Sequence, residues 1–320
     1  MRRKDRKEMK KEVDVIIIGA DVCSLITANL LSKKGYRVAI VDNAIGLGGN
    51  QLYIPVSLKL VQSLGLNLNN PLIIRRTIDK LTMYFNFGKN SIHSYLHFRI
   101  AILDVLNLCE FFAEYMEGLF YLWSEAQIIK QTVDNVHVIV KFPFGIEEIS
   151  SRLLIKNSPP SGDYTLLIST GCVKNSEISD SLIIDYSGIN LYLNLGRFVT
   201  GILTSPKNTF SNLISTIKIP WGPSKFLSKS PVMRFGLSAG HAVPPWIGDY
   251  LMNSALLAYK IASSRLEDKD DESVLREYLN FLSLIDMCET LYHHALNGKI
   301  DELPASFVSE ALRPPREVVI

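Results

Sequence analysis

The stretch VDVIIIGADVCSLITANLLSKKGYRVAIVDN, residues 13–43, decides the fold of this chain. Residues 13–18 are a continuous apolar and mostly β-branched run, which is typical of a strand buried on both faces. Gly19 ends the run, and residues 22–34 then place apolar side chains at helical spacing before Gly35, a residue suited to ending a helix. Residues 37–42 form a second predicted strand. This order predicts a βαβ unit with two parallel strands.

Gly19 and Asp42 are the two features of this unit that indicate dinucleotide binding. A helix N-terminus offers unpaired N–H groups and the positive end of its dipole to a pyrophosphate. An acid about 20 residues further on accepts hydrogen bonds from the adenosine ribose. Asp42 lies 23 residues after Gly19, at the end of the second predicted strand. The strand, the turn glycine, the helix and the acid are therefore all present.

The turn itself departs from the G-x-G-x-x-G pattern of dinucleotide-binding proteins. Its sequence is GADVCS, residues 19–24, so Asp21 and Ser24 stand at the second and third glycine positions. A carboxylate close to a pyrophosphate is repelled by about 1 to 4 kcal/mol, but an aspartate at this position is also a good helix N-cap. Two interpretations stay open: a cofactor-binding turn, or an α/β packing unit capped by Asp21 without a ligand.

Composition limits the class of protein. The chain has 320 residues, of which 47% are hydrophobic, so a sizeable core is expected. Residues 1–12 hold seven basic and three acidic side chains, while the net charge of the whole chain is only +2. A near-neutral body argues against nucleic-acid binding, and the basic tail is either a solvated extension or a weak contact for anionic lipid.

Several absences point to a cytoplasmic protein. The sequence contains no recognisable signal peptide and no apolar run of about 20 residues that would span a bilayer. The four cysteines are far apart and form no C-x-x-C pair, as expected in a reducing compartment. His93 and His97 are four residues apart on a predicted helix, but no third ligand is evident, so no metal site is expected.

The rest of the chain alternates between predicted strands and helices. Residues 92–126 are predicted to be largely helical, and residues 136–142 and 148–155 to form a hairpin. A strand at 164–169 is predicted to stop at Gly171. The remaining expectations are strand character at 183–204, helices at 249–265 and 273–296, and a proline-containing surface tail up to Ile320.

Three of these later segments resemble, in the same order, motifs of the geranylgeranyl reductase family, whose members have an FAD domain of the glutathione-reductase type. The segments are FRIAILD at 98–104, LLISTGCVKNS at 166–176 and GLSAGHAVPPWIGDYLMNSALLAYKIA at 236–262. The resemblance implies an α/β fold: an FAD/NAD(P)-binding Rossmann-like domain with a reduced α+β cap domain and a helical C-terminal extension. The implied boundaries are a basic tail (1–12), the FAD-binding domain (13–50, 99–180 and 228–265), the cap (51–98 and 181–227) and the extension (266–320).

The resemblance also implies FAD as the cofactor. The residues that it assigns to FAD binding are Gly19, Ala20, Asp21, Ser24, Asp42, Arg99, Gly171, Gly240 and Gly248. Arg99 would reach the flavin nucleotide from the start of a helix, Gly171 would be a turn glycine, and His241 would donate a proton to the substrate. The alternatives are a solvated Arg99 and a His241 satisfied by local backbone. Three positions that touch the cofactor in the family are altered here, namely Asp21, Leu237 and Tyr250.

The implied function is that of an FAD-dependent oxidoreductase that reduces carbon–carbon double bonds of an isoprenoid or other lipid-like substrate. A reductant protein or NAD(P)H would supply the electrons, and a lipid substrate would bring the protein into peripheral contact with a membrane. The alternative is a flavoprotein-fold relic, which has lost FAD binding and serves as a non-catalytic binding or partner subunit.

Overall fold

The first sheet of the protein contains the predicted βαβ unit. The computed structural model describes residues 11–48, 53–87, 90–96, 99–157, 164–173, 180–185, 188–196, 199–203, 210–221, 231–236, 246–270 and 272–313. Seven strands form this sheet: β8 (Gly118–Tyr121), β2 (Val38–Val41), β1 (Lys11–Ile18), β11 (Gly145–Lys156), β10 (Val136–Phe142) and β9 (Glu125–Gln131) in spatial order, with β17 (Val232–Arg234) also paired to β11. β8, β2, β1, β11 and β17 are parallel to one another, whereas β10 is antiparallel to both of its neighbours, β11 and β9. This is a Rossmann-like sheet that continues into an antiparallel meander.

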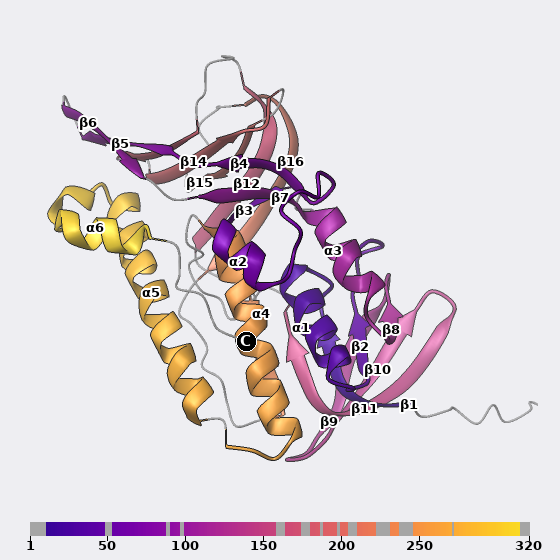
Figure 1. The fold of residues 1–320 in the computed structure, drawn as a ribbon. Helices are drawn as coiled ribbons and strands as arrows, with labels where there is room; N and C mark the ends of the chain where they lie inside the picture. The colour runs from indigo at the N-terminus through magenta and orange to yellow at the C-terminus, as the bar shows by residue number, and fades with distance from the viewer. Residues whose placement is uncertain are drawn as a thin grey trace, which may run out of the picture.

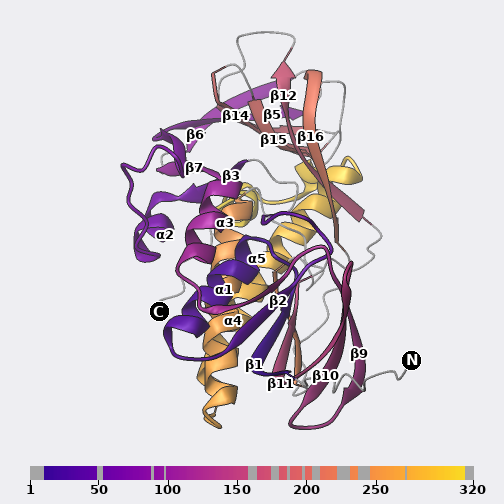
Figure 2. The same cartoon turned by 90° about the vertical axis from the view of Figure 1, so that its right-hand side faces the viewer.

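The second half of β1, residues 15–18, is continuously apolar because both faces of the strand are covered there. Val15 and Ile17 belong to the large core beneath the helices, whereas Val13 and Ile16 pack in a separate cluster with the meander strands β10 and β11. Figure 2 shows the helices on one side of this sheet and the meander curling away on the other. The predicted hairpin is confirmed as β10 and β11.

Three helices cover the core side of the sheet: α1 (Val22–Lys33), α3 (Val105–Glu114) and α4 (Ile247–Leu266). α1 is buried between the other two helices (Figure 1). Because almost all of its residues are buried, α1 has no separate polar face. Asn29 interrupts its apolar pattern because Nδ2 donates to the carbonyl of Phe112 on α3 at 2.9 Å. Thr27 likewise donates to Ala255 of α4 at 3.2 Å.

A second sheet of seven strands lies above the first in Figure 1. Its spatial order is β16 (Phe210–Trp221), β12 (Tyr164–Val173), β15 (Val199–Leu203), β14 (Gly188–Asn194), β13 (Ser181–Asp185), β5 (Leu81–Phe87) and β6 (Asn90–Leu96). A three-stranded sheet contains β3 (Tyr53–Ser57), β7 (Ile100–Asp104) and β4 (Ile74–Ile78), and the short helix α2 (Leu58–Ser63) follows β3. The strand character predicted at 183–204 is confirmed by β13, β14 and β15.

The prediction that residues 92–126 are largely helical is wrong. Only α3 is helical there, and β6, β7, β8 and the start of β9 occupy the described remainder. β7 pairs with β3 and β4, and all five of its residues are buried, so these long-range partners outweigh the local preference. His93 therefore lies on a strand, while His97 is outside the described residues.

The C-terminal extension is a helical layer that packs on the core. α5 (Glu272–Leu296), a short 3-10 turn η2 (Ile300–Glu302) and α6 (Ala305–Ala311) follow α4 at the left of Figure 1. The two predicted helices are confirmed as α4 and α5, but a surface tail is wrong for the described part of this segment. Val308 and Leu312 are buried, and Trp246 Nε1 donates to the carbonyl of Leu312 at 2.6 Å.

Candidate functional site

The turn after β1 has the backbone of a dinucleotide-binding turn, and Asp21 caps it. Gly19 has a φ of +110°, a conformation that favours glycine, and its N–H donates to Val41 at the end of β2. Asp21 is the N-cap of α1, and its Oδ1 accepts from the N–H of Ser24 at 2.9 Å. The predicted cap is thus confirmed. The carboxylate lies at the helix N-terminus, which is the position that attracts an anion.

Asn157 completes this turn and was not singled out by the sequence. It follows β11, the strand parallel to β1, and its N–H donates to Ile18 at 2.8 Å. Its Nδ2 donates to Ser24 Oγ at 2.9 Å and also to Asp21 Oδ1. Its sequence signal is its position, two residues after the apolar run 153–155 and directly before the sequence SPPSG.

The prediction that Gly171 is the turn glycine after the meander is wrong. Gly171 lies within β12 of the second sheet, where it pairs with Val199 and Leu213. The parallel pairing of β11 with β1 instead brings Lys156 and Asn157 to the end of β1. The structure therefore places Gly171 in a different sheet from Gly19.

Asp42 lies beside the turn, as the sequence predicted for a ribose-binding acid. Its Oδ2 accepts from the N–H of Ala20 at 2.5 Å and its Oδ1 from the N–H of Ala44 at 2.7 Å. These bonds hold the chain after β2 against the turn after β1. Two carboxylates, Asp21 and Asp42, thus converge on the backbone of one short turn.

Burial raises the pKa of Asp21 from its usual 3.8 to about 6. Loss of water around the carboxylate is the largest cause, and the neighbouring charge of Asp42 adds to it. The hydrogen bonds from the N–H and hydroxyl of Ser24 act in the opposite direction but are outweighed. Asp21 therefore changes its charge near neutral pH.

The third motif of the sequence forms packing contacts in its described part. Gly236 has a φ of +57°, and a Cβ there would come within 2.5 Å of Asn157 Oδ1. A Cβ on Gly248, in the first turn of α4, would come within 2.4 Å of the carbonyl oxygen of Pro55 in β3. Tyr250 is fully buried, and its hydroxyl donates to the carbonyl of Gly236 at 2.8 Å. Gly248 and Tyr250 thus join α4 to β3 and to the end of β17.

The structure places the remaining predicted site residues as follows. Arg99 does not begin a helix, because it precedes β7, and it forms an exposed ion pair with Asp79 at 2.8 Å. Ala20 and Ser24 lie in the Asp21 turn. Leu237, Gly240 and His241 lie outside the described residues, so their roles remain predictions.

A hollow of about 510 Å³ lies beside Asp42. Its walls include Asn43, Trp123, Phe142 and Pro143. Trp123 has a φ of +53°, which is uncommon for a bulky residue and is found at strained, functional positions. The N–H of the following residue, Ser124, donates to the Asp42 carbonyl at 2.8 Å. The hollow therefore has two aromatic residues, Trp123 and Phe142, in its wall and lies next to the predicted ribose acid in space.

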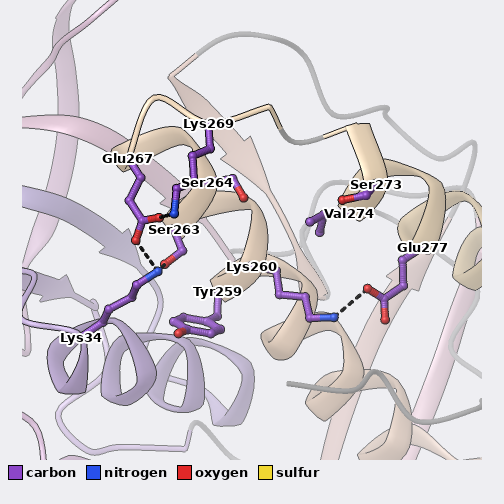
Figure 3. Close-up of a pocket in the computed structure, with 10 residues that line it drawn as sticks. All are labelled: Lys34, Tyr259, Lys260, Ser263, Ser264, Glu267, Lys269, Ser273, Val274 and Glu277. Carbon is purple, nitrogen blue, oxygen red and sulfur yellow. Dashed lines mark hydrogen bonds and ion pairs between the residues drawn. The ribbon is translucent and has the colours of Figure 1, made fainter.

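A second hollow, of about 400 Å³, lies between α1, α4 and α5 and is shown in Figure 3. Lys269 pairs with Glu267 at 2.6 Å, Lys260 pairs with Glu277 at 2.7 Å, and Lys34 pairs with Glu267 as well. The hydrogen bonds from Lys269 and Lys34 lower the pKa of Glu267 to about 2. Because every lysine that lines it is paired, this hollow is an ionic contact between helices.

Comparisons with known proteins agree with this geometry. Residues 17–57 match the family of NAD(P)-binding Rossmann-like domains. No curated protein sequence matches the chain. A geranylgeranyl bacteriochlorophyll reductase-like protein from Thermoplasma acidophilum is similar in structure, with a TM-score of 0.65 and 10% identity, over 95% of this chain and 89% of that one.

Two further solved structures are similar over most of their length. PqsL from Pseudomonas aeruginosa, a probable FAD-dependent monooxygenase, has a TM-score of 0.66 and 13% identity, over 91% of this chain and 99% of that one. A flavoprotein/dehydrogenase from Cytophaga hutchinsonii has a TM-score of 0.61 and 14% identity, over 88% and 86%. The chain thus has the fold of FAD-binding oxidoreductases, and the Rossmann-like prediction is confirmed.

Proposed function

We propose that the protein is an FAD-dependent oxidoreductase that acts on a hydrophobic substrate. The observation that carries this proposal is the arrangement of Gly19 and Asp42 at adjoining strand ends, in a chain that shares its fold over most of its length with flavin-dependent enzymes. Similarity to a geranylgeranyl bacteriochlorophyll reductase-like protein supports an isoprenoid or other lipid-like substrate, reduced at a carbon–carbon double bond.

The residues fit the adenosine half of FAD. Asp42, at the end of β2, would accept hydrogen bonds from the ribose hydroxyls of the adenosine. The two aromatic residues in the wall of the neighbouring hollow, Trp123 and Phe142, would suit the stacking of its planar base. Gly19, with its positive φ, and the N-terminus of α1 suit the pyrophosphate when Asp21 is neutral. When bound, the flavin would supply hydride transfer, and the protein would supply orientation and exclusion of water.

The hydrophobic class of the proposed substrate bears on how the substrate reaches the protein. In the described part of the chain, no helix is long and apolar enough to cross a membrane. We further propose that a lipid-like substrate is drawn from a membrane surface or from a carrier, and that a reductant protein or NAD(P)H returns electrons to the flavin.

A second candidate function is favoured by one observation. The ionised Asp21 carboxylate, held by Ser24 and Asn157, fills the anion position of α1 with an anion of the protein's own. If this carboxylate always excludes the pyrophosphate, the protein is a flavoprotein-fold relic that acts as a non-catalytic binding or partner subunit.

Substitution of Asp42 tests the proposal. Asp42→Ala should weaken FAD binding at least tenfold, because it removes the ribose acceptor and frees the N–H groups of Ala20 and Ala44. The measurement is quenching of FAD fluorescence during titration with protein at pH 6. Asp134→Ala, which removes an exposed carboxylate from the β9–β10 turn, is the matched control and should bind as the wild type does. Equal affinities of all three proteins would contradict the assigned cofactor site.

A further inference from the structure

The Asp21 turn presents negative charge to a phosphate. Asp21 and Asp42 are both acids, and their carboxylates are joined to adjacent parts of the same turn. The other titratable groups coupled to Asp21 are Cys23 on α1, Cys109 on α3 and Tyr250 on α4. None of these groups carries a positive charge. With both carboxylates ionised, a pyrophosphate meets only like charge from these side chains.

Asn157 provides a second, independent observation at the same place. It is 5% exposed, and its Oδ1 has no hydrogen-bond partner among the described residues. A buried carbonyl oxygen of this kind requires a donor. With a proton on Asp21, the amide can turn over, so that Oδ1 accepts from the Asp21 hydroxyl and gains the donor that it lacks beside the ionised carboxylate.

We propose that this turn takes up a proton on Asp21 when it binds the pyrophosphate of a dinucleotide, so that cofactor binding is stronger at acidic pH. The inference rests on the proposed function, because FAD is the dinucleotide that the fold implies. One proton moves from solvent to a carboxylate oxygen of Asp21, and no bond of the cofactor is made or broken.

The pKa of Asp21 determines how strongly the affinity for FAD depends on pH. In the free protein the pKa of Asp21 is about 6, and the negative phosphates raise it further in the complex. With this pKa about half of Asp21 is neutral at pH 6 and about 1% at pH 8, so the affinity for FAD should fall by up to about 50-fold between these two values. FAD itself does not change its charge in this range.

The test is the dissociation constant of FAD at pH 6 and pH 8 and constant ionic strength for three proteins: wild type, Asp21→Asn and Asp14→Asn. Asparagine keeps a side-chain oxygen to cap α1, so the variant should fold. Asp14→Asn removes one carboxylate from β1, where Asp14 accepts from the N–H of Arg37 at 2.7 Å, and serves as the charge-matched control. Calorimetry at pH 7 in two buffers of different ionisation enthalpy counts the protons taken up.

The proposal predicts that wild type and Asp14→Asn lose affinity between pH 6 and pH 8, that Asp21→Asn does not, and that wild type takes up nearly one proton per FAD. Equal wild-type affinity at the two pH values overturns the proton linkage and leaves the proposed function intact. A pH dependence that persists in Asp21→Asn assigns the proton to another group and also overturns it. Failure of wild type and Asp21→Asn alike to bind FAD at pH 6 overturns both the linkage and the FAD-dependent function.

Discussion

Replacing Gly248 with alanine is expected to lower the free energy of unfolding by about 3 kcal/mol or more. A Cβ on Gly248 would lie 2.2 Å from Val56 Cγ2 and 2.4 Å from the carbonyl oxygen of Pro55, and a backbone atom cannot move aside at low cost. Asp249 fixes the same contact, because its carboxylate accepts from the N–H of Ser57 at 2.9 Å. The α4 helix therefore cannot shift away from β3 without breaking this bond.

Chemical denaturation of Gly248→Ala beside Gly46→Ala measures this effect. Gly46 has no positive φ, and a Cβ there would meet nothing within 4 Å, so its alanine variant should change stability by less than about 1 kcal/mol. If Gly248→Ala were as stable as the wild type, α4 and β3 would not pack as described, and Gly248 would be free to serve the cofactor instead.

Asp21→Asn is expected to stabilise the protein without ligand by up to about 3 kcal/mol at pH 8 and by little at pH 4. The folded pKa of Asp21 is raised from 3.8 to about 6, mainly by burial. The stability that the neutral Asp21 carboxyl contributes to the folded protein is therefore fully present below pH 3.8, and it is lost as the pH rises through 6. Above pH 6 the wild type holds a poorly solvated charge, whereas the asparagine variant does not.

Urea denaturation of both proteins at pH 4 and pH 8 is the measurement. The difference in unfolding free energy between Asp21→Asn and the wild type should increase from pH 4 to pH 8, with most of the increase between pH 4 and pH 6. The difference in unfolding free energy between Asp14→Asn and the wild type should not show this increase. A constant difference between wild type and Asp21→Asn at the two pH values would mean that Asp21 is well solvated, and it would remove the basis for a proton at the turn.

The elements that the sequence predicted well are those with strong local patterns. β1, α1 and β2 follow from the apolar run, the Asp21 cap and Gly35, and α4 and α5 follow from their helical spacing. Gly19 and Asp42 could be placed in the candidate site because their positions depend only on this βαβ unit. Asp21 was correctly identified as a cap, but its raised pKa depends on burial by distant segments.

The features that the sequence did not predict depend on long-range pairing. The first four residues of β7 are apolar, and nothing local distinguishes a buried strand from a helix in such a segment. Asn157 reaches the site only because β11 pairs with β1 across more than a hundred residues, whereas the sequence motif predicts Gly171 at this turn. The sequence motif predicts that Tyr250 replaces a cofactor-binding glycine, whereas its hydroxyl bonds Gly236 after β17 and its ring stacks on Phe281 of α5.

The central claim is that this chain holds FAD, and the visible absorption spectrum tests it most directly. Purified protein is mixed with excess FAD at pH 6, passed through a gel-filtration column and scanned. The account predicts that flavin absorption bands stay with the protein peak and are shifted relative to free FAD. A colourless protein peak, with all flavin in the small-molecule fraction, would contradict the oxidoreductase and leave a flavoprotein fold that Asp21 has closed to its cofactor.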